Sequence, residues 1–184
     1  MEGHYFDIET YSAGDKPNEK TDKIISIQFQ KIDIKTGEPL GKLQILREWE
    51  ESEESIVKFI HRWFFKRNVW QFIPIGFNLN FEWKFLAEKF KQYNLDTRDY
   101  GEFLDFPQID IKFLAVIKKG TFIGASLSSI SSKEKDGSVI KEFYENKEFK
   151  NIEEYIENET KGFLELYQKI AKNIDNVIDL KENN

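Results

Sequence analysis

The chain has 184 residues, which fits one domain with a core of ordinary size. Hydrophobic residues make up 40% and aromatic residues 15%, so the composition excludes a disordered chain. The formal net charge of −6 disfavours a broad, non-specific nucleic-acid binder, whose affinity comes from many Lys and Arg side chains on phosphates. It leaves open an enzyme with a small acidic centre.

Three features of the sequence concern its cellular compartment. Cysteine is absent, which excludes a disulfide framework and a thiolate site. No apolar stretch reaches the length of a membrane-spanning helix, and the N-terminus lacks the pattern of a signal peptide. We therefore expect a cytoplasmic protein that does not act in a membrane.

Hydrophobic periodicity predicts the elements in chain order. Strands are expected at 4–9, 24–34, 40–49 and 72–77, and helices at 52–67, 80–93 and 151–173, with a short strand turning helical over 108–117 and a short helix over 125–130. Residues 133–138 are expected to form a loop and 173–184 a C-terminal tail, whose end DLKENN at 179–184 is expected to be frayed. Ser52 is a suitable N-cap for the first helix.

This order, with hairpin strands first and then strands alternating with helices, predicts an α/β fold with a mixed β-sheet flanked by helices. We expect a single domain over 1–184, with its core at about 4–172.

The segment YFDIET at 5–10 places two carboxylates on one face of the first strand. Side chains alternate along a strand, so Asp7 and Glu9 share a face with Tyr5. Two like charges on one face repel each other. They are tolerated in solvent, or where a cation lies between them.

Two further acids lie in apolar surroundings. Glu82 falls in the first turn of the helix expected after the strand at 72–77. Glu159 follows Tyr155 by four residues, so the two share one face of the last helix, which is otherwise apolar. Because an unpaired buried charge is unfavourable, an acid on that face should have a partner.

A cation would account for all four acids. Carboxylates are hard oxygen ligands that suit Mg²⁺ or Mn²⁺. Two such ions roughly 3.5–4 Å apart can hold the attacking and leaving oxygens of phosphodiester cleavage. Tyr155 could then orient or deprotonate the attacking water.

Three segments together resemble the motifs of the DEDD-type 3′→5′ exonucleases, which have a ribonuclease-H-like fold. They are FDIET, GFNLNFEWKFL at 76–86, and Tyr155 with Glu159. The tyrosine spacing is similar to that of the proofreading exonuclease domains of family-B DNA polymerases, as are IDIK at 109–112 and GASLSSIS at 124–131. The resemblance covers about residues 4–170 and includes no polymerase segment, so it implies a stand-alone exonuclease.

The resemblance implies a metal-dependent 3′→5′ exonuclease that removes nucleotides from single-stranded DNA or RNA ends, with DNA the expected substrate. Replication or repair proteins are possible partners. It implies two Mg²⁺ or Mn²⁺ ions held by four metal ligands, and it adds Tyr155 to these as a catalytic residue. The ligands are Asp7, Glu9, Glu82 and Glu159.

The sequence departs from the family pattern at two positions. The family usually has aspartate in its second and third motifs, and this chain has Glu82 and Glu159 there. Each change adds one methylene and can move the carboxylate by roughly 1.5 Å. The alternative is therefore a weak or inactive exonuclease-like module that binds nucleic-acid ends or a replication or repair partner. A third interpretation is a structural or regulatory protein whose acids are ordinary surface residues.

Several other residues are candidates for supporting roles. Thr10, Asn78 and Phe81 are candidates for contact with the terminal nucleotide; the alternative for Asn78 is a turn residue and for Phe81 a core ring. We interpret Asp110 as a strand-end acid outside the group of four. His4 and His61 are expected to be structural or surface residues and not ligands.

Overall fold

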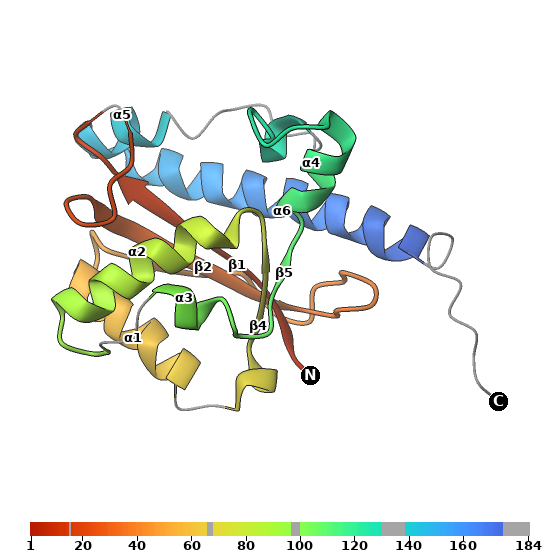
Figure 1. Ribbon diagram of the computed structural model, residues 1–184. Coiled ribbons are helices and arrows are strands. Elements are labelled where there is room, and N and C mark those ends of the chain that lie inside the picture. Colours follow the sequence, from red (N-terminus) through yellow and green to blue (C-terminus); the bar gives the residue numbers. More distant parts are fainter. Residues whose placement is uncertain (15, 66–67, 97–99, 130–138, 175–184) are drawn as a thin grey trace.

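The computed structural model describes residues 1–14, 16–65, 68–96, 100–129 and 139–174 (Figure 1). The elements are β1 (Gly3–Tyr11), β2 (Lys23–Ile32), β3 (Gln44–Arg47), α1 (Glu53–Phe65), η1 (Val69–Gln71), β4 (Ile73–Gly76), α2 (Leu79–Gln92), α3 (Tyr100–Phe103), β5 (Ile109–Asp110), α4 (Lys112–Lys119), η2 (Leu127–Ser129), α5 (Val139–Glu145) and α6 (Phe149–Asn173).

The five strands form one mixed sheet in the order β3-β2-β1-β4-β5. β2 runs antiparallel to both β1 and β3, whereas β4 is parallel to β1 and β5 is parallel to β4. Figure 1 shows the long helix α6 crossing one side of this sheet, with α1 and α2 on the other. The predicted α/β fold with a mixed sheet flanked by helices is confirmed.

β1 separates two hydrophobic cores because its side chains alternate. Phe6 and Ile8 are buried in the core shared with α1 and α2. Tyr5 is buried in the core shared with α6, against Phe163. Asp7 and Glu9 belong to the same face of β1 as Tyr5, so both carboxylates lie on the α6 side of the sheet.

The corner between β4 and α2 is tight. A Cβ atom added to Gly76 would lie 2.7 Å from the carbonyl oxygen of Phe6, so a larger residue would force β4 away from β1. Asn78, at the N-cap of α2, has φ 70° in the left-handed region, which asparagine tolerates better than most residues. The corner thereby holds the first turn of α2 close to β1.

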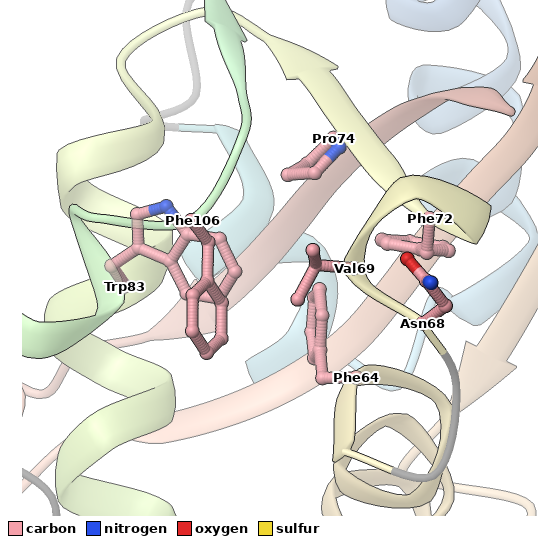
Figure 2. A pocket seen from close by; sticks show the side chains of 7 residues that line it. All are labelled: Phe64, Asn68, Val69, Phe72, Pro74, Trp83 and Phe106. Carbon is pink, nitrogen blue, oxygen red and sulfur yellow. The ribbon is translucent and has the colours of Figure 1, made fainter. Parts of the chain in front are cut away.

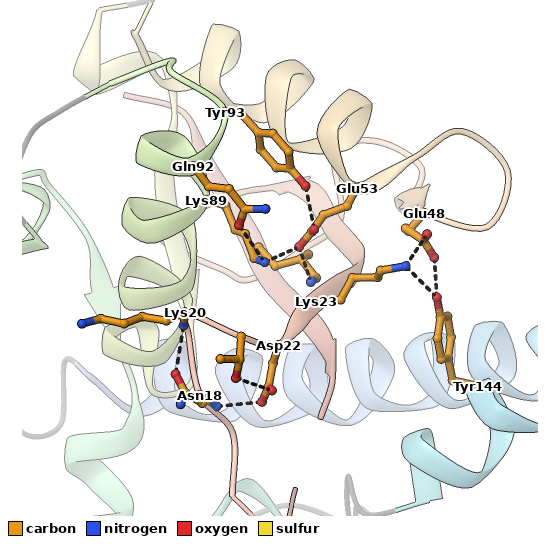
Figure 3. A network of polar contacts seen from close by, with 12 residues as sticks. Asn18, Lys20, Asp22, Lys23, Glu48, Glu53, Lys89, Gln92, Tyr93 and Tyr144 are labelled. Atoms are coloured by element: carbon orange, nitrogen blue, oxygen red, sulfur yellow. Dashed lines mark hydrogen bonds and ion pairs between the residues drawn. The ribbon is translucent and has the colours of Figure 1, made fainter. Parts of the chain in front are cut away.

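A buried ion pair joins α1, α2 and the start of β2 (Figure 3). Glu53 in the first turn of α1 accepts hydrogen bonds from the backbone N–H of Ile24 at 2.7 Å and from the hydroxyl of Tyr93 at 2.7 Å. The ammonium of Lys89 lies 3.0 Å from the same carboxylate, and both side chains are buried. These contacts satisfy both charges and fix α1 against α2.

A small void lies in the α1–α2 core beside η1 (Figure 2). It measures about 10 Å³, and its lining is mostly apolar: Phe64, Asn68, Val69, Phe72, Pro74, Trp83 and Phe106. A cavity of this size holds at most one water molecule, so it is a packing gap and not a binding site.

Most predicted elements are present, with shifted ends. Ser52 caps α1 as expected, since its hydroxyl oxygen accepts a hydrogen bond from the N–H of Ser55 at 3.1 Å. The predicted strand at 40–49 is much shorter in the structure, as β3, and the short helices α3 and α5 were not predicted. The predicted loop at 133–138 and the tail from 175 lie outside the described residues. Within the described ranges, no helix combines the length and apolar character needed to cross a membrane.

Candidate metal centre

Three carboxylates from opposite ends of the chain meet between the sheet and α6. Asp7 and Glu9 come from β1 and Glu159 comes from the middle of α6. One oxygen atom from each of the three lies within 4.8 Å of the others, and all three side chains are half-buried. Three carboxylates this close repel each other unless protons or a cation reduce their charge.

Asp7 also has neutral polar partners on its own sheet. Gln28 stands directly opposite Asp7 in the β1–β2 pairing, and its Nε2 donates to Oδ2 of Asp7 at 3.0 Å. The hydroxyl of Tyr5 donates to the same oxygen at 3.2 Å. Burial, and next the charges of Asp7 and Glu159, raise the pKa of Tyr5, so its hydroxyl keeps its proton at neutral pH.

Glu82 lies beside this group, next to Asp7. It is buried in the first turn of α2, and it is not one of the three acids whose oxygens all lie within the 4.8 Å limit. Burial, followed by the charge of Asp7, raises its pKa well above the ordinary value. Its Oε2 atom is buried without a hydrogen-bond partner among the described residues.

Tyr155 approaches the acids from α6, one helical turn before Glu159. Its ring is buried in the core formed with Ile25, Ile152 and Ile156. Burial and the charges of Glu9 and Glu159 raise the pKa of its hydroxyl, which is hydrogen-bonded to Glu159. The hydroxyl therefore keeps its proton at neutral pH. Of the two roles predicted for Tyr155, a protonated hydroxyl favours orienting the attacking water over deprotonating that water.

The predicted nucleotide-contacting residues lie around the acids in different settings. Thr10 follows Glu9 at a β-bulge, where Glu9 pairs with Ser26 and Thr10 pairs with Ile24. Bulges of this kind change the direction of side chains at the end of a strand. Phe81 is half-buried, and its ring packs against Phe85 with centroids 4.7 Å apart.

Asn78 and Asp110 form one arrangement at the N-terminus of α2. The two carboxylate oxygens of Asp110 accept hydrogen bonds from the N–H groups of Asn78, at 2.8 Å, and Leu79, at 2.9 Å. The ammonium of Lys112 donates to Oδ1 of Asn78 at 2.7 Å. Asp110 therefore caps the helix that carries Glu82, a role that its position in the sequence did not indicate.

The two histidines lie in aromatic surroundings. His4 stacks on Phe72 with ring centroids 4.5 Å apart, on the strand face opposite Asp7. His61 packs against Phe65 and Phe90, with Asp96 at 3.7 Å. Neither belongs to the acidic group found among the described residues.

The donor set fits a hard divalent cation. All three clustered ligands are carboxylates, which suit Mg²⁺ or Mn²⁺ better than Zn²⁺. Glu82 adds a fourth carboxyl group with an unsatisfied buried oxygen next to Asp7. A cation would offset the repulsion among the acids and provide a partner for that oxygen.

No family model matches the chain, and no curated protein matches it. Among solved structures, several of exonuclease I are similar to it. Exonuclease I in its apo form has 12% identity and a TM-score of 0.49, covering 64% of this chain and 30% of that one. E. coli exonuclease I with a dT13 oligonucleotide gives 12% identity and a TM-score of 0.49, over 64% of this chain and 29% of that one. Likeness at this level assigns no activity, so a function has to be argued from the side chains of this chain.

Sequence reasoning missed the polar residues that surround Asp7. Ser26 and Gln28 alternate with Ile27 and Phe29 in β2, so they occupy one face of the strand. Polar residues at every second position of a strand are typical of a solvent-facing surface, yet both are fully buried here. The strand register that pairs Gln28 with Asp7 and Ser26 with Glu9 would have identified both residues, and the sequence did not predict this register.

Proposed function

We propose that the chain is a metal-dependent 3′→5′ exonuclease of the DEDD type, in its tyrosine branch, which removes nucleotides from single-stranded DNA ends. The observation that carries the proposal is the convergence of Asp7, Glu9 and Glu159, with Glu82 against Asp7. Residues distant in the sequence make one acidic group, and a tyrosine is hydrogen-bonded within it. An ordinary surface would separate such charges.

In this proposal Asp7, Glu9, Glu82 and Glu159 hold two Mg²⁺ or Mn²⁺ ions. When bound, the ions stabilise negative charge on the attacking and leaving oxygens of the phosphodiester. Glu82 gives up its proton to act as a ligand, so metal binding releases a proton from this residue. Glu82 is buried, so competing water has little access to its carboxyl group.

Tyr155 orients the attacking water in this proposal. Its proton stays on the hydroxyl, which is hydrogen-bonded to Glu159. The phenolic oxygen can still accept a hydrogen bond from a water molecule. Thr10, Asn78 and Phe81 would contact the terminal nucleotide, with the Phe81 ring offering a surface for base stacking.

The proposal is tested with 5′-labelled single-stranded DNA and RNA incubated with Mg²⁺, with Mn²⁺ or with a chelator. We expect DNA to be shortened stepwise from its 3′ end in either metal and to stay intact in chelator. The Asp7→Ala variant serves as the blank because it removes a ligand from the centre of the group. Cleavage that survives exhaustive chelation, or that is unchanged in this variant, contradicts the proposal.

A second candidate function is an exonuclease-like module that binds strand ends or a replication or repair protein without cutting. Two observations favour it: glutamate stands at both 82 and 159, and Glu82 lies outside the group of three mutually close acids. Fluorescence anisotropy with labelled single strands separates the two candidates. Tight binding of a 3′ end with no cleavage in Mg²⁺ or Mn²⁺ supports the module.

A further inference from the structure

A row of buried polar side chains lies on β2 directly beside the candidate metal centre. Ser26 and Gln28 are both 0% exposed, and they pair across the sheet with Glu9 and Asp7. Burying an amide is unfavourable unless its donors and acceptors have partners. The hydrogen-bond partners of Gln28 therefore indicate the role of this buried amide.

The two ends of the Gln28 amide have different partners. Oε1 accepts a hydrogen bond from the hydroxyl of Ser26 at 3.2 Å. Nε2 donates to Oδ2 of Asp7 at 3.0 Å. Asp7 and Ser26 together fix the amide, because its NH₂ must face the carboxylate, which can only accept, and the Ser26 hydroxyl donates to the amide oxygen.

Two donors to Asp7 end on the same oxygen atom. Gln28 and the hydroxyl of Tyr5 both donate to Oδ2. A carboxylate oxygen has about two lone-pair sites, so these two donors fill Oδ2. These two donors therefore restrain the rotation of the Asp7 carboxylate.

We propose that Gln28, set by Ser26 and assisted by Tyr5, is a positioning residue that holds the Asp7 carboxylate in its metal-binding orientation. This rests on the proposed function, since it assigns a role within the same site. Gln28 acts through Asp7 and touches neither metal nor substrate. Its hydrogen bond fixes the side-chain rotation of Asp7 and offsets part of the repulsion from Glu9 and Glu159 before a cation binds.

The expected loss of metal affinity follows from the effect of comparable residues in other metal sites. Removing a side chain that orients a metal ligand typically weakens metal affinity about 10- to 100-fold. Gln28→Met keeps an unbranched side chain of similar length and removes the donor. We expect the dissociation constant for Mn²⁺ to rise by about 10- to 100-fold in this variant.

Gln30→Met is the matched control. Gln30 lies two residues further along β2, and its Nε2 donates to the carbonyl of Gly41 at 2.7 Å instead of to an acid. The experiment is calorimetric titration of Mn²⁺ into the full chain for wild type, Gln28→Met and Gln30→Met. The thermal midpoint of each in chelator is measured alongside, because a purely structural role would lower the midpoint and leave the Mn²⁺ affinity of the folded protein unchanged.

The outcomes separate the two proposals. Wild type that binds no Mn²⁺ overturns the metal-dependent function and this inference together. Wild type that binds Mn²⁺, with equal dissociation constants for Gln28→Met and Gln30→Met, overturns this inference alone. If Gln28→Met does not fold, Ser26→Ala and Tyr5→Phe replace it, since each removes only one hydroxyl. Weaker Mn²⁺ binding in both supports the role of Gln28, and unchanged binding in both refutes it.

Discussion

Glu82 is buried beside Asp7, and the two carboxyl groups would repel each other if both were ionised. Burial and the charge of Asp7 raise the pKa of Glu82 well above its ordinary value, so without metal the pair holds a proton. An ionised Glu82 is unfavourable in this arrangement when no metal ion is bound. A cation that replaced the proton would offset the charges of both carboxylates.

Glu82→Gln should stabilise the metal-free protein at neutral pH. A raised pKa in the folded state means that the folded chain holds a proton that the unfolded chain has released. Stability is therefore lost as pH rises above the unfolded pKa of Glu82, and glutamine avoids this loss. Thermal unfolding in chelator should show a higher midpoint for the variant at pH 7, by about 2–4 °C for each kcal/mol gained.

The gain should vanish near pH 4, where wild-type Glu82 is protonated in both states. Glu157→Gln is the control, since Glu157 is exposed on α6 and its substitution should leave the midpoint unchanged at either pH. A Glu82→Gln variant that is less stable than wild type at pH 7 would show that the carboxylate is ionised and stabilised in the metal-free fold. Mn²⁺ affinity should fall in this variant whatever its stability.

Tyr155→Phe should slow strand cleavage without weakening metal binding. The variant keeps the buried ring and removes the hydroxyl that is hydrogen-bonded to Glu159. We expect about a 10- to 100-fold lower rate, because a water that is no longer held in line reacts less often. Rates are compared at saturating Mn²⁺, and the Mn²⁺ dissociation constant is measured separately.

Tyr167→Phe controls for the loss of a tyrosine hydroxyl on the same helix. Its hydroxyl donates to the carbonyl of Ile34 at 2.9 Å, in the core between α6 and the β2–β3 connection. This variant should lose a little stability and no activity. Equal rates for wild type and Tyr155→Phe would remove the role assigned to Tyr155.

Lys89→Ala should destabilise the fold without acting on the acidic centre. The variant leaves Glu53 buried without its cation, which typically costs about 3–5 kcal/mol. Urea unfolding measures the loss. Lys150→Ala, which removes an exposed partner of Glu154, should change the free energy of unfolding by less than about 1 kcal/mol. Similar values for the two variants would mean that the Glu53–Lys89 pair is solvated.

The first strand and the long helix could be predicted because the side-chain pattern of each element recurs with a regular period. Alternation at 5–9 placed Asp7 and Glu9 on one face, and the i, i+4 spacing placed Tyr155 beside Glu159. Both relationships are local, so they survive any arrangement of the rest of the chain. The short helices α3 and α5 were missed because four and seven residues are too few to show a helical period.

The surroundings of the acids could not be predicted in the same way. Gln28 meets Asp7 only through the register of β1 against β2, and register depends on the connecting loop and on the bulge after Glu9. Asp110 caps α2 only because β5 lies beside β4. Both contacts come from tertiary structure, and one sequence contains no pairing information for them.

The two glutamates allow a decisive test of whether this site is adapted or decayed. If the backbone is matched to the longer side chains, Glu82→Asp or Glu159→Asp should lower the initial rate of single-strand cleavage about 100-fold, since a displacement of about 1 Å in such a site has that effect. If the site has decayed from an aspartate pair, the double variant should instead cut faster than wild type.

The position of Glu82 favours adaptation. It is buried next to Asp7, and its Oε2 lacks a hydrogen-bond partner among the described residues, so a cation shared with Asp7 would give that oxygen a partner. Glu157→Asp, an equal shortening at an exposed position of α6, controls for the change of residue type. Slower cleavage in the single variants confirms a matched site, and faster cleavage in the double variant contradicts it. If wild type, Asp7→Ala and the double aspartate variant are all equally inert, the enzyme proposal falls and the end-binding module takes its place.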